Sequence, residues 1–187
     1  KKFAPDLIFF IHWNWIVPTE IHEKFLCIVF HLAPLPYGRG GSPIQNLILR
    51  KFKNAPICAL RMTEELDAGP IYLKKNISLD GKLSEIFARM NLILNEMMDI
   101  LITELPTPKK QTGQKYVFKR LGNEDNKLPQ NLTLESLFDR IRMLDDKDYP
   151  NSFIEYGNLK IEFSDASFEK NELICKAKIN IKKIESN

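Results

Sequence analysis

The sequence predicts an α/β fold with a Rossmann-like, mostly parallel β-sheet and a small C-terminal appendage of one helix and antiparallel strands. Two observations support the sheet. Short apolar runs rich in aromatic and β-branched residues, at 7–11, 25–30 and 55–62, are typical of buried strands. Segments whose apolar residues recur at helical spacing alternate with them, the longest at 83–105.

Local signals place the remaining elements of the first half. Thr19 suits the start of a short helix, and Ser42 followed by Pro43 is typical of a helix cap and first helical position. The segment 33–43 contains three prolines and three glycines, so we expect a structured loop there without regular secondary structure. Residues 71–77 predict a further strand.

The second half has a different character. Residues 107–114, rich in Pro, Lys and Gln, predict a linker or crossing loop, and 116–121 suit a short strand. Thr133 is the expected cap of a helix that continues to about Leu144. Three alternating segments predict an antiparallel unit: 153–156, 159–163 and 173–181. We therefore divide the chain into a partial Rossmann-like core, 1–106, and a linker with a small α+β subdomain, 107–187.

The composition excludes some classes of protein. A net charge of +3 is too mild to argue for nucleic acid binding by itself. The apolar runs are shorter than a membrane-spanning helix needs. Cys27, Cys58 and Cys175 lie at no metal-ligand spacing, so we expect no metal, and buried free thiols at Cys27 and Cys58 suit a reducing cytoplasm.

The first residues do not resemble the start of a domain. The sequence lacks an initiating Met and a signal-peptide pattern, and Lys1–Asp6 leads directly into a strand. We expect an N-terminal stretch to precede this sequence.

Two loops carry residues suited to chemistry. His31 lies at the carboxyl end of a buried strand, where ligands bind in open α/β sheets. Asp67 follows the next predicted strand, so parallel strands would bring both loops to one edge. A carboxylate beside an imidazole fixes the orientation of the ring, and such a pair can move protons or stabilise developing charge.

Each motif taken alone favours a structural role. A single histidine at a strand end is more often a structural residue, with its hydrogen bonds made within the protein, than a catalytic one. Asp67-Ala68-Gly69 alone is more often a turn than part of a site. Gly38-Arg39-Gly40-Gly41 resembles a phosphate-binding loop only weakly, because no Lys-Ser/Thr follows. The two loops together, in this order, are more specific.

Together these segments resemble the folate-dependent formyltransferases, over about residues 3–105. The motifs that match in order are Pro5–Ile8, Ile16–Pro18, His31, Leu35-Pro36, Arg39–Pro43 and Leu66–Gly69. The resemblance implies an enzyme that uses N10-formyl-tetrahydrofolate as co-substrate. His31 would lie at the developing oxyanion and Asp67 would orient it and help take the proton of the amine. The residues expected to contact the folate are Trp13, Trp15, Ile16, Arg39, Gly40, Met62, Thr63, Glu64 and Leu66.

The sequence departs from the family pattern at two places. The family's Asn, two residues before the histidine, is Val29 here, which cannot donate a hydrogen bond. Asn14 is the candidate substitute, although a plain loop role is equally open. The family also begins with a strand–helix–strand section that precedes these motifs. Trp13 and Trp15 could stack on a pterin or pack in the core.

Several acceptors and partners stay open. Asp139–Leu144 and Tyr149-Pro150 resemble the sugar-directed or peptide-synthetase-associated branch, so we rank a nucleotide-linked amino sugar first. Formylation of methionyl-tRNA ranks second, because the tail is short with scattered acidic residues; we expect no nucleic acid and no membrane partner. An inactive folate-binding or interaction module is the alternative of another class. The β appendage also suits a homodimer.

Overall fold

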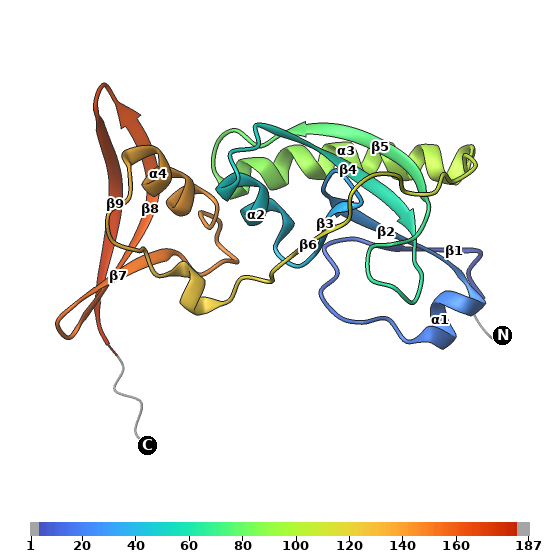
Figure 1. Ribbon diagram of the computed structural model, residues 1–187, viewed down its shortest axis with the longest axis horizontal. Helices are drawn as coiled ribbons and strands as arrows, with labels where there is room; N and C mark the ends of the chain where they lie inside the picture. Colours follow the sequence, from blue (N-terminus) through green and yellow to red (C-terminus); the bar gives the residue numbers. More distant parts are fainter. Residues whose placement is uncertain (1–3, 183–187) are drawn as a thin grey trace, which may run out of the picture.

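The computed structural model describes residues 4–182. Figure 1 shows two bodies side by side along the long axis: an α/β unit that includes the N-terminal strand, and a smaller unit of one helix on three strands. Among the helices of residues 4–182, none has the length and apolar character needed to cross a membrane.

The larger unit is organised by a four-stranded sheet in the order β1-β2-β4-β5. The strands are β1 (Leu7–Phe10), β2 (Leu26–Leu32), β4 (Asn54–Arg61) and β5 (Ile71–Ser78). The pair β1–β2 is parallel, whereas β2–β4 and β4–β5 are antiparallel. The α/β class is confirmed, but the expectation of a mostly parallel sheet is wrong for these two pairs.

The connections explain the strand directions. Parallel neighbours need a crossover, usually a helix that runs back along the sheet. The helix before β4 is α2 (Pro43–Leu49), only seven residues long. Between β4 and β5 the chain turns within 62–70, and the Arg61 N–H donates to the Pro70 carbonyl at 2.9 Å. The turn 62–70 therefore reverses the chain between β4 and β5, and β4 also runs antiparallel to β2.

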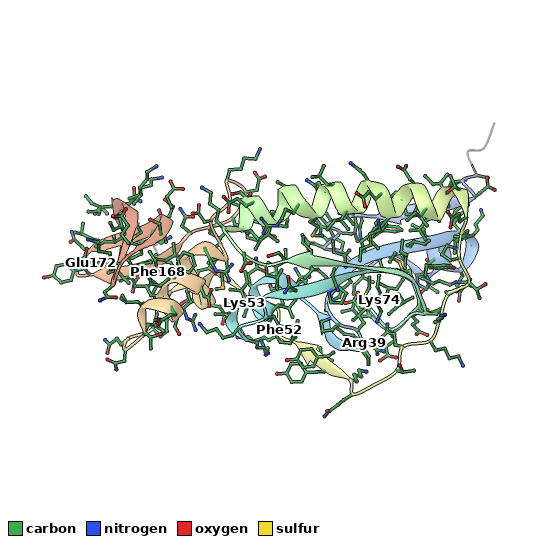
Figure 2. The ribbon with its side chains drawn as sticks, turned by 90° about the horizontal axis from the view of Figure 1, so that it is seen from above. Arg39, Phe52, Lys53, Lys74, Phe168 and Glu172 are labelled. Carbon is green, nitrogen blue, oxygen red and sulfur yellow. The ribbon has the colours of Figure 1, made fainter. Side chains whose placement is uncertain are left out.

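The long helix forms where the helical spacing of apolar residues predicted it. The long helix α3 (Leu83–Thr103) buries Leu83, Ile86, Met90, Leu94, Met97 and Leu101. It covers one face of the four-stranded sheet, and Figure 2 shows it opposite the segment that contains β6. The short helix α1 (Thr19–Lys24) lies beside β2, where Phe10, Val17 and Cys27 form a second, smaller core.

The segment 33–43 contains a strand that the sequence analysis missed. β3 (Tyr37–Gly40) pairs in parallel with β6 (Tyr116–Phe118), which follows the crossing loop. The expectation of no regular structure was wrong because glycines permit this close pairing: a Cβ on Gly40 would lie 2.8 Å from the Phe118 carbonyl oxygen. The chain after the long helix thus returns to the first unit.

The smaller unit matches the predicted order. After a short 3-10 turn, η1 (Asn123–Asn126), the Thr133 hydroxyl caps α4 (Leu134–Arg142) by accepting from the Ser136 N–H. The strands β7 (Ser152–Tyr156), β8 (Leu159–Glu169) and β9 (Glu172–Ile181) form an antiparallel sheet, as expected.

A buried arginine ties the two units together. The Arg142 Nη1 donates to the carbonyls of Leu79 and Gly81 at 2.6 and 2.8 Å, and its Nε contacts the Asp139 carboxylate at 2.7 Å. Lys51 reaches the second oxygen of Asp139 at 2.8 Å. Because every charged group here has a partner, the smaller unit is held against the larger one through an ion-pair network.

Candidate functional site

The candidate site is organised around His31, near the end of β2. The side chain is buried, 7% exposed. Its Nε2 lies 2.7 Å from the Gly38 carbonyl oxygen, and its Nδ1 lies 3.5 Å from Asp67 Oδ2. Both ring nitrogens face acceptors, and only the doubly protonated ring can donate to both at once.

Asp67 reaches His31 by a route that differs from the predicted one. Since β4 is antiparallel to β2, the end of β4 lies beside the start of β2, with Arg61 opposite Ile28. The loop 62–70 then folds back over the sheet. Gly69 allows this, because a Cβ there would lie 1.7 Å from the Arg61 carbonyl oxygen. The two predicted residues do meet, but through the loop and not through parallel strand ends.

The carboxylate of Asp67 is held by backbone as well as by His31. The Gly40 N–H donates to Asp67 Oδ2 at 2.9 Å, so one oxygen faces both an amide and the imidazole. A charge-assisted hydrogen bond of this kind is stronger than a neutral one. Because Gly38 and Gly40 both belong to β3, this strand fixes both members of the pair.

Arg39, between these glycines, connects the site to the crossing loop. Its Nε and Nη2 donate to Gln111 Oε1 at 3.1 and 2.8 Å, and its Nη1 lies 2.9 Å from Glu65 Oε1. Lys115 also pairs with Glu65, and the two cations lower the pKa of that exposed carboxyl. The side chain of Arg39 is 11% exposed, and its partners hold it beside the loop of Asp67.

The residues predicted to contact the folate form two groups. Trp13, Trp15 and Ile16 lie in the loop between β1 and α1 and are exposed, Ile16 at 93%. Core packing, the alternative for the two tryptophans, is not what the structure shows for Trp15, which is 75% exposed. Trp13 packs edge-on against Phe10 and Trp15.

The second group lies on the loop of Asp67. Met62 packs against the smaller core that contains Val17, which brings the bases of the two loops together. Thr63 donates to the Glu65 carbonyl at 3.1 Å. Glu64 and Leu66 are exposed. The two loops thus present polar and apolar side chains beside His31 and Asp67.

Asn14 is not brought to the pair. It is exposed on the β1–α1 loop, and among residues 4–182 no hydrogen bond joins it to His31 or Asp67. Val29, at the family's Asn position, is half-buried and packs against both apolar clusters. The role of Asn14 as a substitute amide stays a prediction.

The sequence analysis missed two residues that build the site. Gln111 bonds Arg39 and also donates to the Asp67 and Gly69 carbonyls. Asn46, in α2, donates to the carbonyls of Gly41, Ser42 and Lys119 and so fixes the end of the glycine-rich segment. Neither residue lies in a recognisable motif. Asn46 lies on the other side of α2 from the stripe Ile44, Leu47 and Ile48, so the apolar periodicity gave no signal for it.

Ser42 stands at the cap position of α2 as predicted, but its hydroxyl accepts from the Leu121 N–H at 3.0 Å and does not cap the helix. Cys27 and Cys58 are buried free thiols, as expected. Burial raises the pKa of Cys58 to about 11, so this thiol beside His31 on the sheet is not a nucleophile at neutral pH. Residues 4–182 contain no cluster of three potential metal ligands.

Known proteins resemble this chain in both sequence and fold. Residues 123–181 match the family described as methionyl-tRNA formyltransferase, C-terminal domain. The structure of methionyl-tRNA formyltransferase from Clostridium thermocellum is 43% identical, covers 95% of this chain and 79% of that one, and superimposes with a TM-score of 0.92.

More distant relatives agree. Methionyl-tRNA formyltransferase of Syntrophomonas wolfei is 29% identical over 171 residues, which is 86% of this chain and 54% of that protein. The chain spans about half the length of the curated relatives it matches. HypX from Aquifex aeolicus, solved with tetrahydrofolic acid, shares the fold at 15% identity and a TM-score of 0.72, over 90% of this chain and 31% of that one.

These matches correct the order of the predicted acceptors. The segment that contains Asp139–Leu144 and Tyr149-Pro150 was assigned to the sugar-directed or peptide-synthetase-associated branch. That segment falls inside the match to the C-terminal domain of methionyl-tRNA formyltransferase. The matches therefore favour the second-ranked acceptor, and they count against the expectation that nucleic acid is not a partner.

Proposed function

Since this chain belongs to the formyltransferase family, we propose that it transfers the formyl group of N10-formyl-tetrahydrofolate to the amino group of methionyl-tRNA. The observation that carries the proposal is the contact between His31, on β2, and Asp67, on the loop 62–70. Trp13, Trp15 and Ile16 are exposed on the loop that follows β1, the parallel neighbour of β2. The 43% identity to a methionyl-tRNA formyltransferase supports the choice of acceptor.

The chemistry follows from the groups around the pair. The amine attacks the formyl carbon, a carbon–nitrogen bond forms, and the carbonyl oxygen takes on negative charge. A protonated His31, in contact with Asp67, stabilises that charge. When the intermediate collapses, the bond from carbon to N10 of the folate breaks. The proton lost by the amine passes through the Asp67–His31 pair to N10 of tetrahydrofolate, so protons and electrons balance.

The spacing of the pair leaves room for this step. The distance of 3.5 Å between Nδ1 and Oδ2 is longer than a direct hydrogen bond. Catalytic contacts are often long without substrate and tighten when it binds. An amine or a carbonyl oxygen of the substrates can therefore compete for either atom.

The apolar loop suits the flat donor. Trp15 and Ile16 are largely exposed. Because covering apolar surface is favourable, a ligand that packs against these side chains gains binding free energy. Leu66, 64% exposed on the loop of Asp67, adds apolar surface on the other side. We propose that the pterin lies between these two loops, as the predicted folate contacts require.

The experiment offers competing acceptors to the natural full-length polypeptide. It is incubated with N10-formyl-tetrahydrofolate and either methionyl-tRNA or a panel of nucleotide 3-amino and 4-amino sugars, and release of tetrahydrofolate is followed. We expect release with methionyl-tRNA only. Because tRNA binding depends on phosphate contacts, the KM should rise steeply with salt. The matched control is uncharged tRNA, which lacks the amine.

Each outcome decides between the candidates. Release with an amino sugar and not with methionyl-tRNA would contradict the proposal and restore the first-ranked prediction. Binding of tetrahydrofolate without release in any mixture would favour the inactive folate-binding module, with Val29 as the lost amide. Release that is unchanged in Asp67→Asn would remove the pair from the reaction.

A further inference from the structure

We infer that Gln111, in the crossing loop, is a positioning residue that sets the place of Asp67 relative to His31; this inference rests on the proposed function. Gln111 contacts neither ring nitrogen of His31 nor the carboxylate of Asp67. It acts through the backbone of the loop 62–70 and through Arg39.

The side chain of Gln111 makes four hydrogen bonds. The Gln111 Nε2 donates to the carbonyl oxygens of Asp67 at 2.7 Å and Gly69 at 2.9 Å. Its Oε1 accepts from two nitrogens of Arg39 at 3.1 and 2.8 Å. Both donors and the acceptor of the amide are therefore used. The four bonds link the crossing segment to the loop 62–70 and to Arg39 of β3.

Apart from those of Gln111, few contacts among the described residues join the loop 62–70 to β3. Asp67 lies outside the strands, with a φ of +51°, a left-handed conformation that aspartate adopts more readily than most residues other than glycine. The ion pair of Arg39 with Glu65 also crosses between the loops, but Glu65 is 59% exposed, and exposed pairs contribute little. Among the described residues, the Gly40 N–H also bonds the Asp67 carboxylate, and Lys115 pairs with the exposed Glu65.

Gln111 itself is anchored. Ile71, the first residue of β5, exchanges two backbone hydrogen bonds with Lys109, both 2.8 Å. Further along, Tyr116 begins the strand that pairs with β3. The side chain of Gln111 thus projects from a segment fixed at both ends, and it can hold a loop that has no strand of its own.

The geometry has a consequence for the reaction. If the Gln111 bonds are lost, the Asp67 carbonyl is free to turn and its carboxylate can leave Nδ1. A misplacement of about 1 Å at a catalytic group costs roughly 100-fold in rate. Since the bonds from Gln111 to the loop carbonyls set the position of the Asp67 carboxylate, the effect of losing them should fall on kcat and not on KM.

The kinetic test uses substitutions that keep the size of the side chain. Gln111→Glu keeps an acceptor for Arg39 and removes both donors to the loop carbonyls. Gln111→Met removes all four bonds. We expect kcat to fall by about 10- to 100-fold in both variants. In Gln111→Glu, which keeps an acceptor for Arg39, the KM for each substrate should stay nearly unchanged, whereas Gln111→Met also frees Arg39, a predicted folate contact, and should raise the KM for the folate. The control is Lys110→Ala, an exposed neighbour in the same segment, which should behave as wild type.

A double-mutant cycle separates positioning from general structural damage. If Gln111 acts through Asp67, then Gln111→Glu should change kcat by less than about twofold in an Asp67→Asn background. A loss of the same size in both backgrounds would overturn the inference, because Gln111 would then act elsewhere.

A third measurement does not depend on turnover. The Gly40 N–H, which bonds the Asp67 carboxylate, and the Ala68 N–H, which bonds the Glu65 carbonyl at 3.3 Å, report the place of the loop. In Gln111→Met their hydrogen exchange should rise about 10-fold or more, and in Lys110→Ala it should not. Unchanged exchange would refute the inference. If wild type transfers no formyl group but the exchange rises, the proposed function fails and the positioning stands.

Discussion

The substitution Gly40→Ala tests whether β3 must approach β6 as closely as the structure shows. Gly40 has a φ of +100°, and an added Cβ would lie 2.8 Å from the Phe118 carbonyl oxygen and 3.3 Å from Val117 Cγ1. A strained backbone of this kind costs about 1–3 kcal/mol. Overpacking against a backbone atom, which cannot rotate away, costs about 1–3 kcal/mol more.

A total of about 2–6 kcal/mol is a large share of the 5–15 kcal/mol that stabilises a typical domain. At about 2–4 °C per kcal/mol for a chain of this size, the melting temperature should fall by roughly 4–24 °C. The backbone shift also withdraws the Gly40 N–H from Asp67, so turnover should fall with it. Thermal unfolding followed by circular dichroism measures the first effect.

Two further glycines provide matched controls. Gly157 has a φ of +58° with open space around its Cβ position, so Gly157→Ala carries the backbone cost of about 1–2 kcal/mol alone. Gly122 has neither a positive φ nor a neighbour within 4 Å, so Gly122→Ala should lie within about 0.5 kcal/mol of wild type. A Gly40→Ala protein that is no less stable than Gly157→Ala would refute the reasoning, because the contact with Phe118 would then cost nothing.

Three other outcomes are expected. Arg142→Met should lower stability by about 3–5 kcal/mol, measured by urea unfolding, because it leaves Asp139 buried beside an exposed lysine only. Hydrogen bonds from Lys82 and Lys176 lower the pKa of Asp165 to about 2 from an ordinary 3.8; this folded-state pKa is depressed, so its stabilisation is present above pH 3.8 and is lost as pH falls toward 2. In Asp165→Asn the melting temperature should therefore depend less on pH between 3.8 and 2 than in wild type. A pH dependence equal to that of wild type would contradict this. Asn14→Ala should lower turnover if Asn14 supplies the missing amide, and unchanged turnover would remove it.

The sequence predicted those parts of the fold that depend on local patterns. The apolar stripe of 83–105 is long and regular, and it became α3 (Leu83–Thr103). The Thr133 cap and the alternating segments of the C-terminal unit also followed from neighbouring residues alone. Each signal is contained within a few residues, so no distant contact can change it.

Features that depend on distant contacts were not predictable in the same way. Strand direction depends on how the chain returns, and the shortness of α2 did not reveal that β4 would reverse. β3 exists because a segment about 80 residues later pairs with it. A buried apolar strand has the same composition whether it runs parallel or antiparallel to its neighbour. The periodicity therefore could not predict the direction of the strand.

The site shows the same division. His31 and Asp67 were identified by their place after strands and by their family motif, and they do lie together. Gln111 was missed because its importance comes from four contacts made across the fold by a residue in a Pro- and Lys-rich segment. Such compositions predict a linker, and only the folded chain shows that this one closes over the loop of Asp67.

The most direct test of the account is the transfer itself. Radiolabelled formyl-tetrahydrofolate is mixed with methionyl-tRNA and the natural full-length protein, and labelled formylmethionyl-tRNA is counted for wild type and His31→Ala. Removal of a group that stabilises the oxyanion costs about 100- to 1,000-fold in rate. We predict label in the tRNA with wild type and a loss of that size in the variant. Equal transfer by both proteins, at equal folding, would contradict the assignment of His31 and with it the central claim.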